Sequence, residues 1–188
     1  TFAFQGGEPT LAGLDFYRQV LALEEKYSNS DVAIYNTIQT NGILLDEAWA
    51  HFLAENQFLV GLSLDGPAFL HDHNRKGPDG AGSCSQVMRA AELLDRFHVA
   101  YNILCVVTGE TAAHTEQVYR FFRKHGFQWL QFIPCLDPIA QDRGLTAFHL
   151  SPSAYGDFLV RIFDVWLADL RKKEYISIRH LDNWMHIL

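Results

Sequence analysis

The sequence predicts an α/β fold in which a mostly parallel sheet is covered by helices and curls toward a barrel. Helix-period and strand-period segments alternate through most of the 188 residues. Such alternation indicates parallel strands joined by right-handed helical crossovers. Turn-forming and polar residues follow the ends of the strands, where folds of this kind gather their chemistry. With 48% hydrophobic residues, the chain can bury one sizeable core and is expected to be one domain or a large part of one.

Three predicted strands lie in the first half of the chain. The first alternates polar and apolar residues and is followed by a glycine turn and a helix, which is expected to carry Phe16, Val20 and Leu23 on one face. The second strand ends in an Asn-Gly turn, the helix after it is capped by Asp46, and the third strand ends in Asp-Gly-Pro. The strands are predicted at residues 1–5, 31–42 and 58–67, and the helices at 14–27 and 44–57.

The second half of the chain continues the alternation. Its first helix is expected to be capped by Ser83 or Ser85. A later helix is closed by Gly126, and the longest begins with Ser151 at the cap and Pro152 at the first helical position. The strands are predicted at residues 100–108, 127–135 and 175–179, and the later helices at 115–126 and 151–173.

Composition excludes several classes of protein. The net charge of −7 comes without a run of Lys or Arg, which argues against a nucleic-acid or anionic-membrane partner. No apolar run has the length of a membrane span, and no secretory leader precedes the first strand. Cys84, Cys105 and Cys135 form no CxxC pair, so neither a disulfide framework nor a zinc site is predicted. These features predict a cytoplasmic protein with reduced cysteines.

The two ends of the sequence suggest a longer protein. The chain begins with Thr1 rather than Met, and its last nine residues, "HLDNWMHIL", contain no helix stop signal. We therefore expect these 188 residues to be an internal portion of a longer chain.

The turn "QGGEP" is the first candidate for a binding site. It matches neither GxxxxGK[ST] nor GxGxxG, so the common phosphate-binding loops are absent. Gly6 and Gly7 permit a close approach to the backbone, and the free carbonyl groups beside the carboxylate of Glu8 suit an ammonium group. The alternative is a strand-to-helix loop with a solvated Glu8. Glu8, Asn41 and Asp65 each follow a strand, and we expect them at one rim of the sheet.

Other polar residues allow two interpretations each. Ser63 is either a donor to a bound carboxylate or a small core hydroxyl. Arg75 is either a bidentate clamp for a carboxylate or a solvated loop arginine. His71 and His73 could be adjacent metal ligands, but without a third ligand nearby a surface loop is favoured.

Five strand-end motifs occur in order: "FQGGEPTL", "IQTNGILL", "VGLSLDGP", "NILCVVT" and "LQFIPCLDP". In this order and at these intervals they resemble the radical S-adenosylmethionine family, and more closely the anaerobic sulfatase-maturating enzymes. The resemblance implies a partial (β/α)6 barrel that lacks its first strand. It also implies that a [4Fe-4S] cluster reduces S-adenosylmethionine to a 5′-deoxyadenosyl radical, which oxidises a Cys or Ser of an unfolded sulfatase peptide to formylglycine.

The same resemblance implies roles for individual residues. The cofactor's methionyl amino group would be held by the turn of Gly6, Gly7, Glu8 and Pro9. Ser63 would make a polar contact to the cofactor, and Arg75 would be a partner of its carboxylate. Val106 and Leu136 would bracket the adenine, and Gln5 would face the substrate pocket. No catalytic base and no metal ligand are predicted within the chain.

One departure from the family pattern is large. The CxxxCxxC motif that binds the catalytic cluster is missing, as are the auxiliary-cluster cysteines and the acidic residue that serves as a base. In the family, the first lies before the start of this chain and the others lie beyond its end. Residues 1–188 are therefore expected to be a partial radical S-adenosylmethionine domain that is inactive alone.

Three alternative functions stay open at this point. The parent protein could be another radical enzyme that modifies peptides. It could be a non-radical βα-barrel lyase or hydrolase that uses Glu8 and Asp65 as acid and base, since paired carboxylates at strand ends can do such work. It could also be a non-catalytic peptide-binding remnant.

Overall fold

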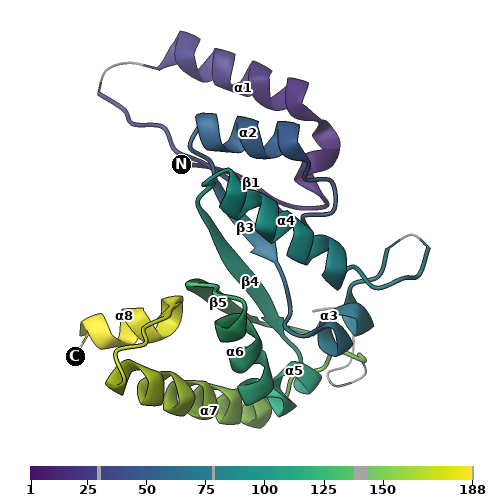
Figure 1. The fold of residues 1–188 in the computed structure, drawn as a ribbon, viewed down its shortest axis with the longest axis vertical. Coiled ribbons are helices and arrows are strands. Elements are labelled where there is room, and N and C mark those ends of the chain that lie inside the picture. The colour runs from purple at the N-terminus through teal and green to yellow at the C-terminus, as the bar shows by residue number, and fades with distance from the viewer. Residues whose placement is uncertain (29–30, 78, 138–143, 145, 188) are drawn as a thin grey trace. The chain divides into compact units, whose positions relative to one another are not determined.

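The computed structural model describes residues 1–28, 31–77, 79–137, 144 and 146–187. Helices and strands alternate along the chain, from purple at the N-terminus to yellow at the C-terminus (Figure 1). The strands follow one another in the sheet in the order β1-β2-β3-β4-β5-β6. Their bounds are β1 Phe2–Phe4, β2 Asn36–Thr40, β3 Leu59–Ser63, β4 Tyr101–Val107, β5 Trp129–Pro134 and β6 Ser177–Ile178.

Strand pairing confirms the predicted fold class. In the described registers, β1 pairs with β2, β2 with β3, β4 with β5 and β5 with β6, and all four pairs are parallel. Parallel neighbours need a crossover connection, and the helices between the strands supply it. The absence of a first barrel strand stays a prediction.

The chain divides into two compact units, residues 1–63 with 85–101 and residues 64–84 with 102–188. The first unit contains a 3₁₀ helix and three α-helices, whose bounds are η1 Pro9–Ala12, α1 Leu14–Tyr27, α2 Glu47–Glu55 and, from its second residue, α4 Cys84–Arg96. Asp46 accepts a hydrogen bond of 2.9 Å from the Trp49 N–H, which confirms the predicted cap of α2.

Aromatic rings pack the first unit. The ring centroid of Tyr17 lies 5.1 Å from that of Phe4 and 5.4 Å from that of Trp49. Tyr17 is buried, whereas Phe16 and Leu23 are exposed and Val20 is half-buried, so the buried side of α1 is centred on Tyr17 and not on the predicted apolar face. Leu23 instead borders an apolar groove of about 490 Å³ beside β1.

The described residues of the second unit form five helices, with the bounds α3 Ala68–Asn74, α5 Gly109–Ala113, α6 Thr115–Lys124, α7 Pro152–Arg171 and α8 Arg179–Ile187. Phe132 of β5 packs against Phe158 of α7 and Phe122 of α6, with ring centroids 5.2 Å and 6.3 Å away. Ser151 caps α7 through the Ala154 N–H, as predicted. Among the described helices, none is long and apolar enough to cross a membrane.

The cap predicted for α4 is wrong. Neither Ser83 nor Ser85 accepts from the start of this helix; the Cys84 N–H donates to Asp72 at 2.8 Å. The Ser83 hydroxyl instead donates to the carbonyl of Arg75. A carboxylate twelve residues earlier replaces the local cap because the loop between α3 and α4 folds back on itself.

The Asn-Gly turn after β2 generates a stability prediction. Gly42 has φ of +75°, and a Cβ built on it would lie 2.6 Å from Leu62 Cδ1 and 3.2 Å from Ala90 Cβ. Leu62 is fully buried and cannot move aside freely. We expect Gly42→Ala to lower the free energy of unfolding by roughly 2–4 kcal/mol, because it adds a left-handed backbone cost to an overpacked core.

Urea unfolding measures this change, and Gly156→Ala is the matched control. Gly156 lies within α7 with no atom within 4 Å of an added Cβ. This control is expected to raise the free energy of unfolding by about 0.5–1 kcal/mol. Equal effects of the two substitutions would contradict the packing argument.

Candidate functional site

Glu8 joins the ends of two neighbouring strands. After β1, Gly6 and Gly7 turn the chain with φ of +93° and +58°. The Glu8 carboxylate oxygen Oε1 then accepts hydrogen bonds from the Thr10 N–H at 3.1 Å and the Thr10 hydroxyl at 2.6 Å, which caps η1. The hydroxyl of Thr40, the last residue of β2, donates to the same oxygen at 2.7 Å. The Asn41 N–H donates to Oε2 at 2.8 Å.

This arrangement gives Glu8 a structural role that the sequence did not predict. Each carboxylate oxygen offers about two lone-pair positions; three donors share Oε1 of Glu8, whereas Oε2 accepts from one donor. One position on Oε2 is left for a further donor. Glu8 and Asn41 do lie together, as expected of strand ends. The contact of Glu8 with a cofactor stays a prediction.

The end of β3 carries a second carboxylate. Asp65 is buried, and its oxygens accept from Arg75 Nε at 2.5 Å and Arg75 Nη2 at 3.2 Å. The Val106 N–H donates to Asp65 at 2.9 Å, so this side chain also fixes the end of β4. The Arg75 fork predicted for a bound carboxylate is thus paired within the chain, with its side chain 28% exposed. The Val106 N–H is engaged by Asp65, and its carbonyl accepts a long contact of 3.9 Å from the Cys105 thiol.

His71 connects the backbone of Asp65 to Ser83 by hydrogen bonds. The Asp65 N–H donates to His71 Nδ1 at 3.2 Å, so Nε2 carries the proton and donates to the Ser83 hydroxyl at 3.0 Å. Burial lowers the pKa of His71, while Asp65 raises it and Arg75 lowers it. His71 is completely buried and therefore belongs to this network, not to a surface pair with the exposed His73.

Residues after β5 form a further cluster that the sequence did not predict. Asp137 accepts hydrogen bonds from the Gly144 N–H at 3.0 Å, the Thr146 hydroxyl at 2.9 Å and His149 Nδ1 at 2.8 Å. The hydrogen bonds from Gly144 and His149 hold the pKa of Asp137 below its ordinary value. The neighbouring Leu136 is 81% exposed. The sequence signal was weak because Asp137 and His149 lie twelve residues apart.

The other predicted positions lie at strand ends. Gln5 is exposed, Pro9 is the first residue of η1, and Ser63 is buried at the end of β3 with 6% exposure. Gly6, Gly7, Glu8 and Ser63 belong to the first unit, and Arg75, Val106 and Leu136 to the second. Their roles toward a cofactor stay predictions.

Burial raises the pKa of all three cysteine thiols. Burial raises the pKa of the Cys84 thiol to about 11, with a contribution from Asp72, and it also raises the pKa of Cys105 and Cys135. A metal ligand must be a thiolate, which a raised pKa disfavours. Within the residues that the structure describes, no group of three or more His, Cys, Asp or Glu side chains could hold a metal ion.

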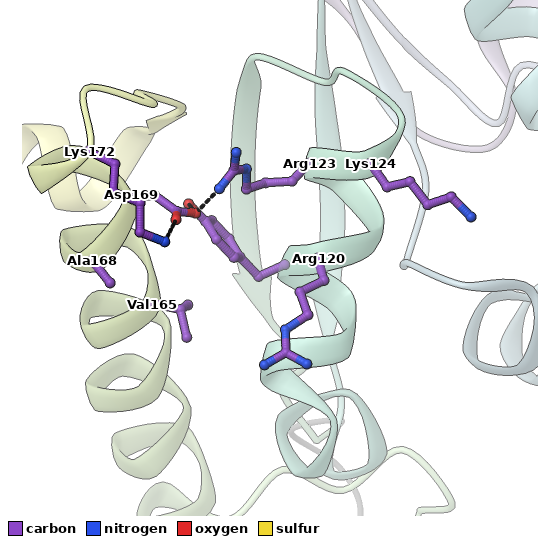
Figure 2. Close-up of a pocket in the computed structure, with 8 residues that line it drawn as sticks. Arg120, Arg123, Lys124, Val165, Ala168, Asp169 and Lys172 are labelled. Carbon is purple, nitrogen blue, oxygen red and sulfur yellow. Dashed lines mark hydrogen bonds and ion pairs between the residues drawn. The ribbon is translucent and has the colours of Figure 1, made fainter.

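A groove of about 450 Å³ lies between α6 and α7 (Figure 2). Tyr119 donates to Asp169 at 3.0 Å, Arg123 pairs with the same carboxylate, and Lys172 approaches it at 3.4 Å. Burial tends to raise the pKa of Asp169, but hydrogen bonds from Arg123 and Tyr119 bring it below its ordinary value. Because its most buried polar groups pair with each other, we assign this groove to the packing of α6 on α7.

Comparison with known proteins gives consistent results. A family model described as the radical SAM superfamily matches residues 1–122. Over 188 residues the chain is 48% identical to a cysteine-type anaerobic sulfatase-maturating enzyme of Clostridium perfringens, and it covers 51% of that protein. A serine-type enzyme of Klebsiella aerogenes is 39% identical over 165 residues, which are 88% of this chain and 40% of that enzyme. The chain spans about half the length of the curated relatives it matches.

Solved structures agree with these relatives. The structure of native anSMEcpe with bound AdoMet and Kp18Cys peptide matches with a TM-score of 0.94 and 50% identity, over 96% of this chain and 50% of that chain. SuiB of Streptococcus suis matches with a TM-score of 0.62 and 18% identity, over 94% of this chain and 37% of that chain. The second match shows a shared fold alone.

The four hydrogen bonds of Glu8, which we call the Glu8 clamp, generate a stability prediction. Glu8→Gln keeps one carbonyl oxygen but places an amide N–H₂ opposite the Asn41 N–H, so one hydrogen bond is lost and two donors meet. We expect the free energy of unfolding to fall by roughly 1–3 kcal/mol in urea titration. The control is Glu25→Gln on the exposed face of α1, with an expected change within about 0.5 kcal/mol. A Glu8→Gln value inside the control range would contradict the clamp.

His71 generates a pH prediction. Its pKa is lowered in the folded chain, so below about pH 6.5 the unfolded chain binds a proton that the folded chain does not. The free energy of unfolding should therefore fall as pH drops from 6.5 toward 5, by up to about 1.4 kcal/mol per pH unit. His71→Gln should flatten this slope, whereas His73→Gln should retain it. Identical slopes in all three proteins would show that His71 titrates normally.

Proposed function

The chain belongs to the radical SAM superfamily, and from this membership we propose that it is the central part of a cysteine-type anaerobic sulfatase-maturating enzyme. The observation that carries the proposal is the identity of 48% over all 188 residues with the cysteine-type relative, against 39% over 165 residues with a serine-type relative. The reaction would be oxidation of a cysteine in an unfolded sulfatase peptide to formylglycine.

The described residues fit one of the two cofactors that this function requires. Three cysteines with raised pKa values, in separate elements, do not fit a [4Fe-4S] cluster. We propose that its ligands lie in parts of the protein outside these residues, so that residues 1–188 form a partial radical SAM domain. S-adenosylmethionine does fit, because the turn after β1 offers a carboxylate with an open acceptor position and two residues without a Cβ.

The proposed work of this chain is to bind and orient the cofactor. When bound and reduced, S-adenosylmethionine supplies a radical that removes a hydrogen atom from the substrate carbon. Glu8 would accept from the cofactor's ammonium group through Oε2, and Gly6 and Gly7 would let the group approach the backbone. Pro9 would fix the direction of the turn, since its ring locks one backbone dihedral.

The remaining predicted residues would hold the two other ends of the cofactor. The Ser63 hydroxyl and the unused N–H groups of Arg75 are donors suited to its carboxylate. The carbonyl of Val106 and the exposed side chain of Leu136 would contact the adenine by backbone and apolar contact. Gln5 would face the peptide.

The free cysteines bear on the cellular location. We propose a cytoplasmic protein, since the three cysteines are unpaired and two of them are buried as small apolar side chains. Free thiols are kept reduced in the cytosol.

The geometry does not favour a lyase or hydrolase that uses Glu8 and Asp65 as acid and base. Glu8 keeps an acceptor position on Oε2, but Asp65 is buried and is paired with Arg75 and with the Val106 N–H, so the pair has no second free carboxylate. A general base needs a free lone pair directed at the substrate proton. Asp65 in particular is engaged on both oxygens.

The proposed function predicts the behaviour of the complete enzyme. After anaerobic reconstitution with iron and sulfide and addition of a reductant, it should cleave S-adenosylmethionine to 5′-deoxyadenosine and convert a cysteine-containing sulfatase peptide to the aldehyde, with release of sulfide. Mass spectrometry of the peptide and trapping of the aldehyde with a hydrazine measure the reaction.

Two comparisons sharpen this experiment. The peptide with Ser in place of the target Cys should react more slowly, and the peptide with Ala should give no aldehyde. A faster reaction with the Ser peptide would move the assignment to the serine type. Cleavage of the cofactor with no change in either peptide would refute sulfatase maturation while leaving the family membership intact.

A further inference from the structure

Within the described residues, one face of the sheet in the first unit carries exposed side chains. Parallel sheets are usually covered on both faces, and their strands are then apolar on both sides. In the central strand β2, Ile38 and Thr40 are each 1% exposed, yet Gln39 between them is exposed. Thr37 is half-buried on the same side as Gln39, since side chains alternate along a strand. Gln39 is thus exposed between two buried residues of the same strand.

The strand register places a second glutamine beside it. Phe4, the last residue of β1, pairs with Ile38 of β2, so Gln5, which follows β1 directly, and Gln39 are each the next residue after this pair. On the other side, Gln39 pairs with Gly61, which has no side chain. Both glutamines are exposed, and neither amide has a hydrogen-bond partner in the part of the chain that the structure describes.

The described residues that neighbour the two amides in the strand register carry no charge. The row below them consists of Ala3, Thr37 and Leu59, which share one register and the same face. Leu59 is 45% exposed there, although it lies in the sheet. We define the bare face as Ala3, Gln5, Thr37, Gln39 and Leu59. In a chain of net charge −7, this face is neutral and combines amides with small or apolar side chains.

Such a face is suited to the main chain of an extended peptide. A glutamine amide both donates and accepts, as each peptide group does, so it can pair with a backbone carbonyl and N–H together. A charged ligand would be matched by charged partners, and none lies on the bare face. The face adjoins the turn of Glu8, because Gln5 is followed directly by Gly6, and the N–H of Asn41, two residues after Gln39, donates to Glu8.

We propose that Gln39, together with Gln5, binds the main chain of the substrate peptide on the bare face and holds it beside the Glu8 turn. This inference rests on the proposed function, since it assumes that the substrate is an unfolded peptide. It adds Gln39 as a substrate-binding residue whose contact is to backbone groups and is therefore independent of the side chains around the target cysteine.

The test uses the complete, reconstituted enzyme and a fluorescently labelled, cysteine-containing sulfatase peptide. Gln39→Ala should raise the dissociation constant of the peptide, and its KM, roughly 3- to 10-fold, the loss expected for one or two backbone hydrogen bonds. The affinity for S-adenosylmethionine, measured by calorimetry, should stay within twofold. Gln39→Glu keeps the acceptor but loses the donor and should show a comparable loss of peptide affinity.

Gln19→Ala is the matched control, since it removes an exposed glutamine from α1, away from the bare face. It should leave both affinities and the turnover unchanged. Thermal unfolding checks that each variant is folded, which is expected because Gln39 is exposed and unbonded.

Each outcome decides a different point. Unchanged peptide affinity in Gln39→Ala, with normal turnover by the unsubstituted enzyme, would overturn the inference and leave the proposed function standing. An equal loss of cofactor and peptide affinity would also overturn it, since Gln39 would then support the cofactor site. If the unsubstituted enzyme bound the peptide without converting it, the proposed function would fail while the binding data still judged Gln39. No peptide binding by the unsubstituted enzyme would overturn both.

Discussion

The carboxylate of Glu8 is the contact on which the candidate site depends. Its four hydrogen bonds join the turn after β1, the start of η1 and the end of β2. A hydrogen bond to an ionised carboxylate is stronger than one to a neutral acceptor. The two glycines before Glu8 can therefore adopt left-handed dihedrals without leaving the turn loose. The shape of any ligand pocket at this rim follows from that clamp.

Asp65 in the second unit also accepts hydrogen bonds from groups on other parts of the chain. It pairs with Arg75 and receives the Val106 N–H, and its own N–H is bound by His71. Glu8 and Asp65 thus each connect the end of one strand to a partner on another element. This internal pairing explains why two carboxylates at strand ends do not by themselves make an acid and base pair. It is compatible with a chain whose task is to position a cofactor that carries the reactive chemistry.

The two faces of the sheet in the first unit differ in composition and in burial. The face toward the helices is packed by the rings of Phe4, Tyr17 and Phe58, which supply burial. The bare face carries two neutral amides, Gln5 and Gln39, which make no hydrogen bond within the part of the chain that the structure describes. Exposed glutamines add little to the stability of a parallel sheet.

Much of the fold could be predicted from sequence, and less of the site. Local patterns determined the βα alternation, the caps at Asp46 and Ser151, and the position of the candidate residues at strand ends, because periodicity and capping depend on residues within a few positions. The tertiary structure decided which groups pair: Glu8 with Thr40, 32 residues away, and Asp65 with Val106, 41 residues away. It also decided that Tyr17 rather than Phe16 is buried. These outcomes depend on strand register and helix rotation, which bring distant donors and acceptors together and leave no local trace in the sequence.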